Sequence, residues 1–166
     1  MTIYFGDGSS QSAAGITSGG KILQVKMGDK TGSSFYNSWT WQDISLSCSI
    51  TPASSSNKIL VLFSVGNSTS GTAHLRLLRG STVIYKGDSG GEAEFMGGYG
   101  GLSGGGKRYR ADQSAGHYLD SPSTTSNTTY KVQTRGNGEY INRGSYEEGT
   151  WYNSRTASSI VLMEVD

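Results

Sequence analysis

Two apolar runs constrain the fold of this chain more than any other feature. Residues 58–65 are almost all aliphatic or aromatic, and residues 159–165, near the end of the sequence, are similar. Apolar runs of this length between turn segments are typical of buried β-strands. The segments between them are rich in Gly, Ser and Thr and show no helical periodicity. The sequence therefore predicts an all-β fold.

The composition favours one domain with large polar faces. The chain has 166 residues, of which 25 are Gly and only 2 are Pro, and its hydrophobic fraction is 34%. That fraction is low for a self-contained globule, so we expect a thin sandwich or a core completed by neighbouring subunits. The apolar runs and the net charge of +1 argue against a disordered chain.

The charge balance and the start of the sequence limit the classes of partner. With 14 basic and 13 acidic residues, there is no bulk attraction to nucleic acid or to an anionic membrane. No apolar run reaches the ~18 residues of a membrane span, so we expect no membrane insertion. The first residues lack the basic and apolar regions of a signal peptide. We expect a protein made in a cytoplasm.

Alternation and turn residues predict eight to ten short strands. Residues 44–50 alternate and place Cys48 in the core; as the one cysteine of the chain, it excludes an intrachain disulfide. Residues 44–50 and 58–65 are predicted to form a hairpin. Residues 28–40 are predicted to be a loop. Two more hairpins are predicted, for residues 73–85 around Gly80 and for residues 129–142 around Gly136-Asn137-Gly138. Turn signals at this spacing indicate a sandwich or a barrel.

Four stretches in the same order carry a resemblance to a known family. They are residues 49–61, 77–84, 119–132 and 160–165, and residues 3–11 are similar to segments that precede such domains. Together they resemble a domain of bacteriophage, especially cyanophage, fibre and appendage proteins. The resemblance implies a jelly-roll-like antiparallel β-sandwich, usually trimeric and displayed on a virion, and it carries no catalytic residues.

The family's long shaft has no counterpart here. We therefore expect residues 1–20 to be a short extended N-terminal docking segment and residues 21–166 to form the sandwich. Within the segment, Ile3, Tyr4 and Phe5 are the candidate residues for docking on other virion proteins.

No residue pattern predicts catalysis, a metal site or a cofactor. His74 and His117 lie far apart without partners at metal-ligand spacing, and His74 alternates with Arg76 on an expected solvent face. His117 and Asp120 fall on opposite faces of a strand, which disfavours a triad. The Gly-rich segment 97–106 leads into no helix and so is no phosphate loop.

Aromatic residues outside the alternating strands are the candidate binding groups. Such rings on loops stack on sugars or anchor proteins. The alternative is that some cap the ends of the sandwich or pack at a trimer axis. Trp39 and Trp41 share a strand face, which favours one buried cluster for this pair. The candidates are Trp39, Trp41, Tyr99, Tyr109, Trp151 and Tyr152.

Two non-enzymatic functions remain as hypotheses. In the first, the chain is a trimeric fibre or appendage module of a phage virion that attaches to host cell-surface glycan. In the second, it is a capsid decoration or head-fibre protein anchored through residues 1–20. A depolymerase ranks third, because clustered carboxylates such as Glu92 and Glu94 read as solvated surface.

Overall fold

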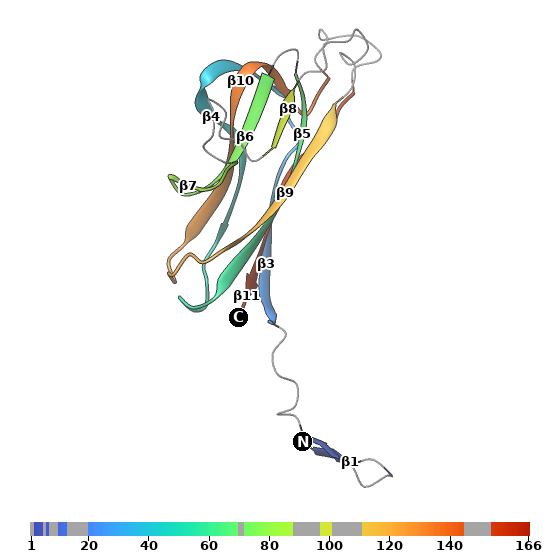
Figure 1. The fold of residues 1–166 in the computed structure, drawn as a ribbon, viewed down its shortest axis with the longest axis vertical. Coiled ribbons are helices and arrows are strands. Elements are labelled where there is room, and N and C mark those ends of the chain that lie inside the picture. Colours follow the sequence, from blue (N-terminus) through green and yellow to red (C-terminus); the bar gives the residue numbers. More distant parts are fainter. Residues whose placement is uncertain are drawn as a thin grey trace.

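The computed structural model is an all-β protein (Figure 1). It describes residues 2–4, 6, 10–12, 20–69, 72–87, 97–100, 111–144 and 154–166. These contain no helix, and every strand pairing among them is antiparallel. The strands are β1 (Thr2–Tyr4), β2 (Ser10–Ser12), β3 (Ile22–Lys30), β4 (Ser34–Ile50), β5 (Lys58–Thr69), β6 (Thr72–Arg79), β7 (Thr82–Tyr85), β8 (Gly97–Gly100), β9 (Asp112–Asp120), β10 (Thr128–Ile141) and β11 (Ser158–Val165).

The pairings of the nine-stranded sheet are nested. The first of its strands, β3, pairs with the last, β11, and β4 pairs with the last but one, β10. Inside these, β5 pairs with β9 and β6 with β7, while β8 adds to β6. Strands that are distant in the sequence therefore lie side by side, and the outermost pairs join the two ends of this part of the chain.

The strands form two layers with the core between them. One layer has the order β3–β11–β5–β9, and the other contains β4, β10 and β6. The layers join where the ends of β5 and β10 pair at Asn67 and Ile141. Along the strands, every second side chain points into the core between the layers. The core residues are Ile44, Leu46, Cys48, Ile50, Ile59, Val61, Phe63, Val65, Leu75, Leu77, Tyr130, Val132, Ile141, Ile160 and Leu162.

One predicted hairpin is confirmed and two are wrong. β6 and β7 pair as expected around Gly80, whose φ is +57°. β4 pairs with β10 rather than β5, because β4 and β5 lie in opposite layers. β10 runs through Gly136-Asn137-Gly138 as one strand, and the register shifts there form an irregularity instead of a turn.

Two further sequence expectations have clear outcomes. The predicted loop 28–40 is mostly strand, because β3 extends to Lys30 and β4 begins at Ser34. Cys48 is a buried core residue, as expected, and burial raises the pKa of its thiol.

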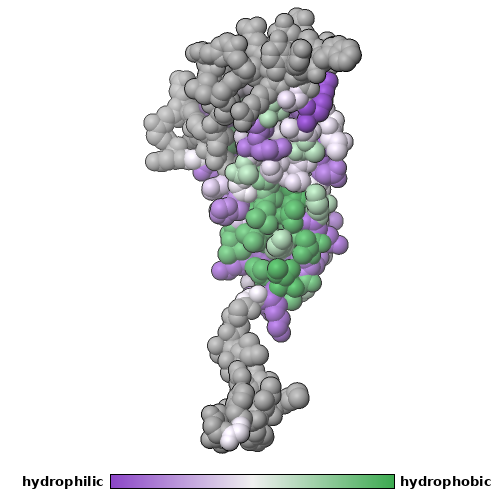
Figure 2. Space-filling view, turned by 90° about the vertical axis from the view of Figure 1, so that its right-hand side faces the viewer, coloured by the Kyte–Doolittle hydropathy of each residue, from purple (hydrophilic) through white to green (hydrophobic). Residues whose placement is uncertain are grey.

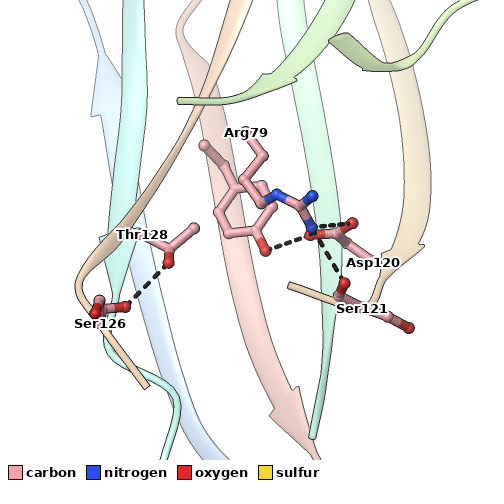
Figure 3. Close-up of polar contacts among 6 residues, drawn as sticks. Arg79, Asp120, Ser121, Ser126 and Thr128 are labelled. Atoms are coloured by element: carbon pink, nitrogen blue, oxygen red, sulfur yellow. Dashed lines mark hydrogen bonds and ion pairs between the residues drawn. The ribbon is translucent and has the colours of Figure 1, made fainter. Parts of the chain in front are cut away.

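A buried carboxylate ties the two layers together at one end of the sandwich (Figure 3). Arg79 of β6 donates to both carboxylate oxygens of Asp120 on β9, at 2.9 and 2.8 Å. The hydroxyl of Tyr130 on β10 donates to the same carboxylate at 2.7 Å. Burial, followed by the contact with Asp120, raises the pKa of Tyr130 far above its ordinary value. The phenol is therefore a permanent donor across the core.

A second buried carboxylate fixes the segment between β4 and β5. Glu164 of β11 is fully buried and accepts hydrogen bonds from the Ala53 amide (2.7 Å), the Asn57 side chain (2.6 Å) and the Gln24 side chain (2.5 Å). Burial raises the pKa of Glu164, but these hydrogen bonds outweigh it and hold the pKa below its ordinary value. Glu164 thus acts as an ionised anchor for a loop without regular structure.

The N-terminal strands belong to a separate sheet. β1 and β2 pair only with each other, with Ile3 opposite Gln11 and Tyr4 opposite Ser10. Ile3 and Tyr4, two of the candidate docking residues, therefore lie in β1, whereas Phe5 is outside the described residues.

Candidate functional site

The outer face of the β4–β10–β6 layer carries a tryptophan–arginine cluster. We use this name for Trp39 and Trp41 on β4, His74 and Arg76 on β6, and Arg135 on β10. The register explains why the basic residues meet: Arg135 lies opposite His74, and Arg76 lies opposite Gln133. Leu75 and Leu77, which alternate with these residues on β6, point into the core.

Trp41 lies against two guanidinium groups. The Arg76 guanidinium carbon is 4.2 Å from the centre of the Trp41 ring, and that of Arg135 is 5.0 Å from it. Cations at these distances are attracted by the electron-rich face of the indole. The half-buried ring therefore holds two positive charges close together on one surface.

A polar chain fixes the position of Arg76. Its Nε and Nη2 donate to Oε1 of Gln133 at 2.8 and 2.6 Å. The amide of Gln133 donates in turn to Asp43 at 2.6 Å, and Lys131 forms an ion pair with Asp43 at 2.8 Å. Although burial raises the pKa of Asp43, the hydrogen bonds from Lys131 and Gln133 bring it below its ordinary value. The guanidinium of Arg76 is thus held in place before any ligand arrives.

Trp39 is the exposed member of the cluster. Its side chain is 62% exposed, although its ring centre lies 6.2 Å from that of His74. His74 itself is only 5% exposed, which corrects the expectation that it lies on a solvent face. Burial and then the charge of Arg135 lower the pKa of His74, which favours the neutral imidazole.

The two tryptophans do not form the single buried cluster that their spacing suggests. Trp39 is exposed and Trp41 is half-buried, and both lie inside a strand of 17 residues rather than in a loop. The buried positions of β4 are the even-numbered Ile44, Leu46, Cys48 and Ile50, so the odd-numbered Trp39 and Trp41 share the outer face. The shared face of the two tryptophans was therefore predicted correctly, but it is the outer face rather than the core face.

The remaining candidate aromatics are placed only in part. Tyr99 lies in β8, where its backbone is opposite Ala73 of β6. Tyr109, Trp151 and Tyr152 lie outside the described residues. Sequence reasoning missed Arg76 and Arg135, because the strand register that brings them to Trp41 joins segments about sixty residues apart. The only local signal was the alternation of Arg76 with the core residues Leu75 and Leu77.

The cluster has the chemistry of a binding surface. The exposed indole of Trp39 can stack on the apolar face of a sugar, and the guanidinium groups that lie against Trp41 can bind carboxylate or sulfate. Within the described ranges, no group of three His, Cys, Asp or Glu side chains is arranged to hold a metal ion. Among the described residues, there is no helix that is long and apolar enough to cross a membrane.

Comparisons with known proteins add no family assignment: no protein-family model matches the chain, and no curated protein sequence is significantly similar to it.

Proposed function

We propose that the chain is a non-enzymatic structural module of a bacteriophage virion, a fibre or appendage unit that attaches to the host surface. The sequence resemblance points to this class of protein. The observation that carries the attachment role is the exposed Trp39 indole next to His74, on the same strand as Trp41, whose ring lies against the guanidinium groups of Arg76 and Arg135. We infer that the ligand is an acidic glycan of the cell surface.

The proposal includes a jelly-roll-like fold and a trimer. The nested pairings β3–β11, β4–β10, β5–β9 and β6–β7 support the first of these, because a jelly roll is a long hairpin folded over into two facing sheets. The trimer is supported by the low hydrophobic fraction of 34% and by the exposed apolar side chains of β3.

One observation favours a second candidate, a capsid decoration or head-fibre protein. β1 and β2 pair with each other and make no pairing with the larger sheet. A short hairpin of this kind is marginally stable alone, which suits a segment that docks on another protein. In this alternative, Ile3, Tyr4 and Phe5 contact the capsid.

Immunogold labelling of intact particles with an antibody against this chain distinguishes the two candidates. Label on the tail or baseplate supports the attachment module, and label over the head supports the decoration protein. Particles without label would contradict both. A parallel assay measures binding of the fluorescent full-length chain to host cells before and after enzymatic removal of surface glycans; binding that survives this treatment argues against a glycan ligand.

A further inference from the structure

The outer face of the β3–β11–β5–β9 layer is a continuous apolar surface. Two rows of directly opposed residues cross all four strands: Val25–Met163–Leu60–Leu119 and Met27–Val161–Leu62–His117. Opposed residues share one face of an antiparallel sheet, and the core is on the other face. Seven of the eight side chains are aliphatic or Met. We call these two rows, together with Ile22, Leu23 and Val165 at one end, the apolar face.

Solvent reaches much of this surface. Met27 is 65% exposed, Val25 53% and Leu119 49%, and Ile22 and Leu23 are 58% and 45% exposed. Figure 2 shows the corresponding hydrophobic patch on the lower half of the sandwich. The five exposed fractions correspond to roughly 500 Å², which is within the size range of the largest, often functional, patches on monomers and somewhat more than half of the ~800 Å² per partner in a stable interface.

Polar residues bound the apolar face. The next row beyond Met27 contains Asp29, Ser159 and Ser64, and the opposite end carries Lys58 beside Val165. The rim therefore has an acidic residue at one end and a basic residue at the other.

We propose that the apolar face is the surface through which copies of this chain associate. Its rows contain no Trp, Tyr or Phe and no acidic or basic residue other than His117, so they resemble a domain core cut in half. That composition is typical of permanent homo-oligomers, whose interfaces are more hydrophobic than those of transient partners. The lack of aromatic residues also distinguishes the face from a membrane-interface anchor.

The charges on β3 favour packing face against face. β3 pairs only with β11 among the described strands and is therefore an edge strand. Lys26 and Lys30 lie along it, and lysines on an edge oppose its extension into a neighbouring sheet. The inference thus deepens the proposed function, on whose trimer it rests, by placing the contact on the sheet face rather than the edge.

Two variants on different strands test the proposal in the full-length chain. Met27→Glu on β3 and Leu119→Lys on β9 each place a charge within the apolar face without touching the core. Phe35→Glu is the matched control, because Phe35 is 52% exposed but lies on β4 in the other layer. Analytical ultracentrifugation gives the mass, and far-ultraviolet circular dichroism confirms folding.

We expect wild type and Phe35→Glu to sediment as trimers, and both face variants to fall to a third of that mass with an unchanged spectrum. A monomeric wild type, or face variants that remain trimeric, would overturn the proposal. A monomer that instead binds neutral phosphatidylcholine vesicles would assign the face to lipid and also overturn it. Host binding is measured separately, so a trimer that binds no cells would contradict the attachment role and leave the assembly face intact.

Discussion

The hydroxyl of Tyr130 donates a 2.7 Å hydrogen bond to the carboxylate of Asp120, and this contact crosses the interior from one layer to the other. Arg79 binds the same carboxylate through two contacts, so the acid has a donor from each of two strands in the opposite layer. The three side chains act as a polar clamp between the two layers.

We predict that Asp120→Ala destabilises the protein by about 3 kcal/mol, because it leaves the buried Tyr130 hydroxyl and the Arg79 guanidinium without their acceptor. Tyr130→Phe removes one donor and keeps the ion pair, so we expect a loss of about 1 kcal/mol. Urea denaturation of both variants measures the difference. Equal losses would show that the clamp does not depend on the carboxylate.

The burial of Glu139 predicts an unusual dependence of stability on pH. Glu139 is fully buried next to Thr134, and burial raises its pKa to about 7, although hydrogen bonds from Thr134 and Asn67 act in the opposite direction. The unfolded value is 4.5. Between pH 4.5 and about 7, Glu139 is protonated in the native state but ionised in the unfolded state. The stabilisation is therefore complete below pH 4.5 and is lost as pH rises to about 7.

We expect the free energy of unfolding contributed by this group to fall by about 3 kcal/mol across that interval. Glu139→Gln keeps the shape and cannot ionise, so its stability should not show this fall. Urea denaturation of both proteins at several pH values measures the contrast. Parallel pH profiles for the wild type and Glu139→Gln would contradict the assignment.

Asn142, directly after β10, links the connection between β3 and β4 to β11, and its backbone conformation is left-handed, with φ of +60°. Its side-chain amide donates to Lys30 O at 2.7 Å and to Gly32 O at 3.2 Å. Its carbonyl oxygen accepts from Ser158 at 2.6 Å. The side chain is 1% exposed, so these groups have no access to water if the contacts are lost.

We predict that Asn142→Gly costs about 2 kcal/mol through the lost hydrogen bonds, since Gly adopts the left-handed conformation freely. Asn142→Ala should cost about 1 kcal/mol more, because Ala also pays the strain of positive φ. Thermal and urea unfolding compare the two variants. If Ala were as stable as Gly, the backbone conformation would contribute nothing at this position.

The sequence predicted the local elements of this protein better than their partners. The apolar runs that became β5 and β11 and the alternation around Cys48 identified strands correctly, because side-chain periodicity is a local property. The partners were missed where proximity in sequence was misleading: β4 was assigned to β5, although the chain crosses between layers at residues 51–57. The buried acids Glu139 and Glu164 were also missed, because their donors come from distant segments.

Only the tryptophans of the candidate site could be predicted from the sequence. Trp39 and Trp41 were identified by residue type, whereas Arg76 and Arg135 became candidates only through the register that sets His74 opposite Arg135. Gly136-Asn137-Gly138 reads as a turn by composition, but β4 and β5 provide pairing partners on both sides of Glu139 and Tyr140, and the strand continues.

The exposed indole of Trp39 gives the sharpest test of the attachment role. We predict that Trp39→Ala lowers binding of the full-length chain to host cells at least tenfold, because a stacking platform is lost, while the melting temperature stays within about 2 °C of wild type for an exposed side chain. Phe35→Ala, a comparably exposed aromatic residue on the same strand but outside the cluster, should bind as wild type does. Titration of fluorescent protein onto cells measures both. Binding of Trp39→Ala at the wild-type level would remove Trp39 from the site, and equal losses in both variants would point to a general effect of surface hydrophobicity.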